Sequence, residues 1–226
     1  MAMIVNSERV SIKVDEERSV SGLLQTPAEA RACYVMAHGA GAGMMHPLMG
    51  AIADGLLERG IATLRYQFPY MENRSKRPDA PKVAHAAVRA AVKAAAQLAP
   101  GLPLFAGGKS FGGRMTSQAQ AAAPLPGVRG LVFLGFPLHP PGRASNERAK
   151  HLFDVAIPML FLQGTRDELA NLELIEMVCK QLGSCAKLKL FQEADHSFHV
   201  PARSGRKDAE VRIELLDAFA DWVKLL

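Results

Sequence analysis

Five short, almost uncharged apolar runs recur along the chain and constrain its fold more than any other feature. They are residues 32–37, 61–64, 102–106, 131–135 and 157–162. Nearly continuous apolar character over four to six residues is typical of strands that are buried on both faces of a parallel sheet. Helix-length segments separate the runs. The sequence therefore predicts a doubly wound, mostly parallel α/β sheet.

The helices between the runs have recognisable starts and ends. Pro47 begins a helix that Gly60 closes, and Pro81 begins an alanine-rich helix that Pro100 ends. The last helix is expected to bury one apolar stripe, made of Leu215, Leu216, Phe219, Val223 and Leu226.

Other strand-like segments lie outside the five runs. Two of them, residues 9–14 and 20–25, come first in the chain, and residues 186–190 alternate leucine with lysine. That alternation predicts a strand with one solvated face near a sheet edge. Because no linker, repeat or low-complexity tract interrupts the pattern, we expect a single domain over residues 1–226.

Composition and charge narrow the class of protein. Hydrophobic residues make up 49% of the 226 residues, which is enough for a large core. The net charge is +5, but the basic residues are scattered and aromatic residues are only 6%, which argues against a nucleic-acid partner. The densest basic segment, residues 73–77, is expected to be a solvated loop.

Membrane and export signals are not evident. Residues 33–53 carry no formal charge, but they contain four glycines, a proline and two histidines, so we do not expect a membrane helix. Three cysteines encode no disulfide framework, and the first residues lack the pattern of a secretory signal. We therefore expect a cytoplasmic protein.

The segment LFAGGKSFGGR, from Leu104 to Arg114, carries the strongest indication of chemistry. A predicted strand leads directly into Gly108-Lys109-Ser110-Phe111-Gly112, and a helical pattern follows. This is the strand–turn–helix setting of a G-x-S-x-G nucleophile turn, in which the two glycines let strand and helix approach closely. The helix N-terminus favours developing negative charge. We predict that Ser110 is a nucleophile.

The same letters allow two other interpretations. A phosphate-binding P-loop would need a glycine five residues before Gly108, where the chain has Pro103. A glycine-rich turn with an inert serine would fit this segment if it stood alone.

A second glycine-rich segment, HGAGAG, begins at His38 directly after the first apolar run. A dinucleotide-binding loop would need a third glycine at Met44 and an acid near Arg65, and it has neither. Such a loop suits an oxyanion hole, because its glycines let the main chain come close to an acyl oxygen. We predict the N–H groups of Ala40 and Phe111 as donors, and His38 as a structural residue.

An acid and a histidine follow Ser110 at the ends of later strands. They are Asp167, in QGTRDE, and His196, in ADHSFH. Asp167 could instead cap a helix that begins near Ala170. Asp195 is a rival acid, but its adjacency to His196 makes a side-chain bond awkward. Serine, acid and histidine in this order at strand ends predict a Ser–Asp–His triad.

Together, HGAGAG, GKSFGGR, QGTRDE and DHSFH resemble the small α/β-hydrolases related to dienelactone hydrolase. The resemblance covers nearly the whole chain and implies an α/β-hydrolase fold with Ser110, Asp167 and His196 as its triad. Dienelactone hydrolases proper use a cysteine nucleophile, so their lactone substrate does not carry over to a chain with Ser110. Some relatives serve as scaffold proteins, so a non-catalytic interaction module stays open as an alternative.

The predicted substrate is small because the chain has little room for a lid. Only residues 136–156 separate two of the predicted strands, and Pro137, Pro140 and Pro141 stiffen the first part. We therefore expect no cap domain and a shallow substrate cleft, lined by Met44, Met45, Leu138 and Phe198.

We predict a serine esterase that needs no cofactor and acts on a small-molecule acyl substrate, with no nucleic-acid or membrane partner. No zinc-binding histidine pattern occurs, and Cys179 and Cys185 match no metal spacing, so we expect no metal. A thioesterase or peptidase stays open, because a triad does not distinguish acyl leaving groups.

Overall fold

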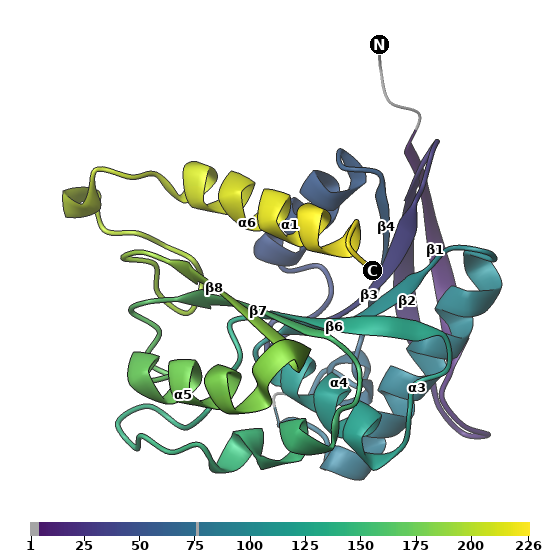
Figure 1. The fold of residues 1–226 in the computed structure, drawn as a ribbon. Coiled ribbons are helices and arrows are strands. Elements are labelled where there is room, and N and C mark those ends of the chain that lie inside the picture. The colour runs from purple at the N-terminus through teal and green to yellow at the C-terminus, as the bar shows by residue number, and fades with distance from the viewer. Residues whose placement is uncertain (1–4, 76) are drawn as a thin grey trace.

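The five apolar runs form the central strands of one eight-stranded sheet in the computed structural model, which describes residues 5–75 and 77–226 (Figure 1). These strands are β3 (Ala32–Ala37), β4 (Ile61–Tyr66), β5 (Leu104–Lys109), β6 (Val128–Leu134) and β7 (Met159–Gly164). The spatial order is β1-β2-β4-β3-β5-β6-β7-β8, and the strands from β4 to β8 run parallel. The predicted doubly wound, mostly parallel sheet is confirmed.

The two edges of the sheet differ in kind. β1 (Val5–Lys13) and β2 (Ser19–Pro27) form an antiparallel hairpin at one edge, and β2 also pairs antiparallel with β4. β8 (Ala186–Phe191) pairs only with β7 and forms the other edge. Its exposed Lys187 and half-buried Leu188 agree with the predicted strand that has one solvated face.

Helices cover both faces of the sheet, which is why its central strands are apolar throughout (Figure 1). α1 (Pro47–Leu57) and α6 (Asp208–Val223) pack on one face, and α3 (Pro81–Leu98), α4 (Phe111–Ala122) and α5 (Leu172–Leu182) pack on the other. The expected stripe of the last helix is wrong at Leu226, which is 40% exposed because α6 ends at Val223.

The remaining elements are short, and none of them forms a cap over the carboxyl ends of the parallel strands. They are α2 (Pro69–Glu72), η1 (Glu147–Asp154), η2 (Gly183–Cys185) and η3 (Ala202–Ser204). Between β6 and β7 only η1 forms, so the connection is too short for a cap domain, as predicted.

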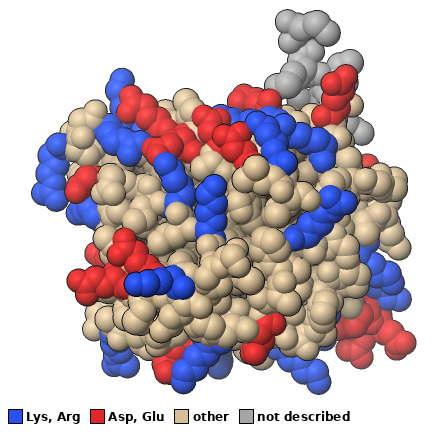
Figure 2. All heavy atoms as spheres, viewed as in Figure 1, with Lys and Arg blue, Asp and Glu red and all other residues tan. Residues whose placement is uncertain are grey.

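The surface mixes charges of both signs. Basic and acidic side chains are interspersed on the face shown in Figure 2. The predicted basic loop after α2 belongs to no long helix or strand, and its Lys76 lies outside the described residues. In the part of the chain that the structure describes, no helix is both long and apolar enough to cross a membrane.

Candidate active site

Ser110 stands on a strained turn between β5 and α4. Its backbone angles are φ 51° and ψ −115°, in a region that non-glycine residues rarely adopt. The neighbouring backbone leaves no room for side chains: a Cβ on Gly108 would overlap the carbonyl oxygen of Ala37, and one on Gly112 would lie 2.6 Å from the same oxygen. The end of β3 therefore packs directly against this turn and holds Ser110 in place.

Asp167 and His196 meet although they are 29 residues apart in the chain. Asp167 follows β7 and His196 follows β8, and the Nδ1–H of His196 donates to Asp167 Oδ2 at 2.7 Å. The carboxylate is fully buried and also accepts from Gln163 Nε2–H, at 2.5 Å, and from the Leu169 N–H, at 2.8 Å. Three donors satisfy this buried acid and fix the orientation of the imidazole.

Asp167 does not cap a helix, and Asp195 does not bind the His196 side chain. α5 begins at Leu172 and is capped by the side chain of Asn171, so Asp167 is not its cap. Asp195 accepts from the main-chain N–H groups of Ser197, at 2.7 Å, and His199, at 2.9 Å. It closes the loop around His196 and makes no bond to that imidazole.

The second histidine of the loop, His199, points away from Asp167. Its Nδ1 bonds to the Asp208 carboxylate at 2.9 Å, and this contact raises the pKa of His199. The side chain is 64% exposed. The two histidines of DHSFH therefore lie in different environments, one in a buried pair and one at the surface.

His38 has the structural role that the sequence predicts. Its Nδ1–H donates to the Gly39 carbonyl at 2.7 Å, and its Nε2 accepts from the Phe68 N–H at 3.1 Å. Burial lowers the pKa of His38 to about 4, so the ring is neutral at physiological pH. His38 thereby holds the loop that carries Ala40.

Two main-chain N–H groups are available near Ser110. No hydrogen bond from the Ala40 N–H is found among the described residues, 5–75 and 77–226. Phe111 is the first residue of α4, where the helix supplies no carbonyl partner. Their role as oxyanion donors stays a prediction.

A cavity of about 280 Å³ brings these groups together at the carboxyl ends of the parallel strands. It is lined by Gly39, Ala40, Ala42, His46, Leu48, Met49, Lys109, Ser110, Leu169, His196 and Ser197. The predicted nucleophile, the predicted base and one predicted oxyanion donor thus border one space.

The predicted lining of the substrate cleft is wrong. Leu138 and Phe198 are buried in the cores on opposite faces of the sheet. Met44 and Met45 line a separate hollow beside the β1–β2 hairpin, and Met45 is 61% exposed. The Met44 N–H donates to the Gln67 side chain at 2.7 Å, which ties this loop to the residue after β4.

The apolar wall of the cavity is formed instead by Leu48, Met49 and Leu169. Leu48 and Met49 lie in the first turn of α1. Their position soon after the glycine-rich loop is the sequence feature that could have identified them as lining residues. Leu169 follows Asp167 by two residues, and nothing in the sequence marks it.

A larger hollow of about 580 Å³ also borders His196. It shares His196 and Leu169 with the cavity at Ser110, and its other lining residues are Arg166, Glu168, Asp195, His199 and Pro201. His196 therefore borders both a largely apolar space and a more polar one.

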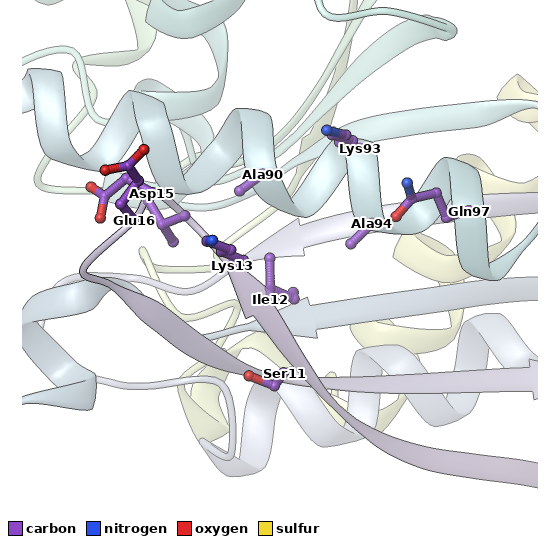
Figure 3. A pocket seen from close by; sticks show the side chains of 10 residues that line it. Ser11, Ile12, Lys13, Asp15, Glu16, Ala90, Lys93, Ala94 and Gln97 are labelled. Carbon is purple, nitrogen blue, oxygen red and sulfur yellow. The ribbon is translucent and has the colours of Figure 1, made fainter.

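A further hollow lies away from Ser110, between the β1–β2 hairpin and α3 (Figure 3). Its volume is about 480 Å³, and charged side chains such as Lys13, Glu16 and Lys93 surround it. No histidine is among its lining residues, so no acid–base pair comparable to Asp167 and His196 serves Ser11 there.

The described residues offer neither a metal site nor, in Cys33 and Cys179, a reactive thiol. In residues 5–75 and 77–226 no group of three or more histidine, cysteine or acidic side chains could hold a metal ion. Cys33 and Cys179 are buried, which raises the pKa of each thiol to about 12, as expected of unreactive cysteines.

Comparison with known proteins agrees with the fold and with the resemblance of the motifs. A family described as the alpha/beta hydrolase domain matches residues 30–224. The chain belongs to the α/β-hydrolase family. The predicted resemblance is thereby confirmed at the level of the family.

Solved structures similar to this α/β-hydrolase extend over nearly its whole length. Dienelactone hydrolase from Anabaena variabilis is 21% identical, with 96% of each chain covered and a TM-score of 0.75. A serine hydrolase homologue from Coxiella burnetii is 21% identical over 93% of this chain and 96% of that one, with a TM-score of 0.76. A serine hydrolase without a lid from Xanthomonas campestris is 20% identical over 96% and 94%, with a TM-score of 0.75.

Proposed function

We propose that this α/β-hydrolase is a serine hydrolase that cleaves carboxylic esters with short acyl chains. The observation that carries the proposal is the 2.7 Å bond between His196 and the buried Asp167, beside a cavity that the strained Ser110 also lines. Asp167 holds Nδ1 protonated, which leaves Nε2 as the basic nitrogen.

In the first half of the proposed reaction, His196 Nε2 accepts the proton of Ser110 Oγ as Oγ bonds to the ester carbonyl carbon. The N–H groups of Ala40 and Phe111 bind the oxygen that gains the negative charge. The tetrahedral intermediate then breaks its bond to the alcohol oxygen, which takes the proton from His196 and leaves.

In the second half, a water molecule repeats the attack on the Ser110 ester. His196 accepts the proton of the water and passes it to Ser110 Oγ as the bond between Oγ and the acyl carbon breaks, which releases the carboxylic acid and restores Ser110. Asp167 stabilises the positive imidazolium in both halves.

The substrate class follows from the two hollows that meet at His196. The acyl chain enters the apolar space of about 280 Å³ at Leu48, Met49 and Leu169, and the leaving group departs toward the polar hollow. Each buried methylene contributes about 0.8 kcal/mol only while a wall is present to bury it. We therefore expect kcat/KM to peak at acyl chains of about two to six carbons on p-nitrophenyl esters. A steady rise to long chains would contradict this substrate class, and a parallel series of thioesters and amides tests the leaving group.

Labelling by a fluorophosphonate probe tests the proposal itself. The probe should modify Ser110 in the folded protein, and peptide mass spectrometry should place the adduct there. Ser110→Ala should remove the label. A matched control exists in Ser117, whose Oγ lies 2.7 Å from His151 Nε2 but which does not line the cavity, so Ser117→Ala should leave labelling unchanged. An unlabelled wild-type protein would favour the alternative, an interaction module on a hydrolase fold.

A further inference from the structure

Lys109 is a buried charged residue that the proposed mechanism does not use. It is the last residue of β5, immediately before Ser110, and only 8% of it is exposed. Its Nζ is completely buried and has no hydrogen-bond partner among the residues that the structure describes. Because burying an unpartnered ammonium is costly, this placement calls for a functional explanation.

The amine of Lys109 lies beneath the loop that carries His196. Gly135, directly after β6, has φ 70° and lies between them: a Cβ there would be 3.0 Å from Lys109 Nζ and 3.3 Å from His196 Nδ1. Because Lys109 Nζ and His196 Nδ1 both lie so close to this one point, the two nitrogens are near each other. The ring of Phe198, from the same loop, has its centroid 6.0 Å from Nζ.

Titratable groups from three loops lie near Lys109, and one of them is His46, before α1, which lines the same cavity. The others are Asp167, after β7, and Asp195, after β8, whose charges act on the amine, and the His196 imidazole, which lies across Gly135. Gly39, in the loop after β3, also lies beside the lysine stem, since a Cβ there would be 3.5 Å from Lys109 Cγ. The amine and the imidazole thus share the field of one buried carboxylate, Asp167.

We propose that Lys109 is a positioning residue whose buried amine controls the pH at which His196 becomes a base. The role of His196 as a base rests on the proposed function, but the sharing of the Asp167 charge is a property of the folded protein. A protonated Lys109 opposes a second positive charge on the imidazole, whereas a neutral Lys109 leaves the full field of Asp167 to it.

The electrostatics give this coupling a direction in the physiological range. Burial lowers the pKa of Lys109 to about 7, against the opposing effect of Asp167 and then Asp195. Below that pH the ammonium weakens proton binding by His196. Above it, the neutral amine lets Asp167 stabilise the imidazolium that forms during each proton transfer.

A histidine NMR titration of the Ser110→Ala protein tests the coupling without any need for turnover. In the Ser110→Ala background, Lys109→Met keeps the length of the side chain and removes the charge. We expect the titration midpoint of the His196 imidazole to move up by about one pH unit in this variant. Lys187→Met, at an exposed position on β8, is the matched control and should leave the midpoint in place.

An unchanged midpoint in Lys109→Met, or an equal shift in Lys187→Met, would overturn the proposal. If Lys109→Met does not fold, the Ser110→Ala protein alone still decides. Its His196 curve should show a second inflection near pH 7 from Lys109, and a single inflection would refute the coupling. Because no result depends on hydrolysis, failure here is distinct from failure of the proposed esterase activity.

Discussion

The Ser110 turn and the His196 loop border the same cavity but are held by different forces. The turn is fixed by backbone packing, since β3 leaves no space for a side chain at Gly108 or Gly112. The loop is fixed by side-chain hydrogen bonds, in which Asp195 closes it from within and Asp167 binds its histidine from a neighbouring strand end.

This difference predicts different responses to substitution. A hard-sphere contact with backbone cannot relax without moving a strand, whereas a lost hydrogen bond leaves a loop that can still reach its working geometry part of the time. We expect changes to the backbone of the turn to be costly in stability, and changes around the loop to be costly mainly in rate.

The largest expected effect is on the chemistry of the turn. Ser110→Ala removes the proposed nucleophile but no packing contact, so kcat should fall by about 10⁴–10⁶ while the free energy of unfolding stays near that of the wild type. Ester hydrolysis and urea denaturation on the same preparation measure both. A folded Ser110→Ala protein that keeps most of the esterase activity would show that another group attacks the ester.

The two histidines of the loop should differ almost as strongly. His196→Ala should lower kcat about as far as Ser110→Ala, because the members of a triad act as one unit. His199→Ala should change kcat by less than about threefold, since it breaks only an exposed contact with Asp208. Initial rates on a short-chain p-nitrophenyl ester measure both, and an exchange of the two outcomes would mean that the base is His199.

Alanine substitutions at Gly108 and Gly101, which both have positive φ, should lower the free energy of unfolding by different amounts. Gly108→Ala drives a Cβ into the Ala37 carbonyl and should lower the free energy of unfolding by about 3 kcal/mol or more. Gly101→Ala has φ 79° but nothing within 4 Å of the added carbon, so it should cost about 1 kcal/mol. Equal costs in urea denaturation would mean that the turn yields to side chains and is not held by sterics.

The smallest expected effect is on the closure of the loop. Asp195→Ala removes the acceptor for two main-chain N–H groups, and kcat/KM should fall about tenfold as His196 loses its fixed position. Ser197→Ala keeps its main-chain N–H and so should retain most of the activity. If Asp195→Ala hydrolyses the ester at the wild-type rate, the Asp167 bond alone holds the loop.

Much of the fold was predictable because its causes are local. Strands buried on both faces must be apolar throughout, so the five runs mark β3 to β7 to within a few residues. The turn was visible for a similar reason, since close backbone packing at Gly108 and Gly112 requires glycine. The roles of Ser110, Asp167 and His196 in catalysis stay predictions, although the structure brings the acid and the histidine into contact.

The lining of the cavity could not be predicted, because no local pattern encodes it. Met44 and Met45 line a different hollow, and the loop that carries them is tied by the Met44 N–H to Gln67, a residue 23 positions later in the chain. Leu169 reaches the cavity only because β7 stands two strands from β5.

Local chemistry in this chain is therefore enough to specify a doubly wound sheet, a strained serine turn and the order of an acid and a histidine along it. The chain order β3-β4-β5-β6-β7-β8 becomes β4-β3-β5-β6-β7-β8 in space, and this arrangement decides which strand ends become neighbours. Distances such as 2.7 Å between His196 and Asp167, and the burial of Lys109 beneath the same loop, follow from that packing. They depend on contacts between residues remote in sequence, which no single segment of the chain contains.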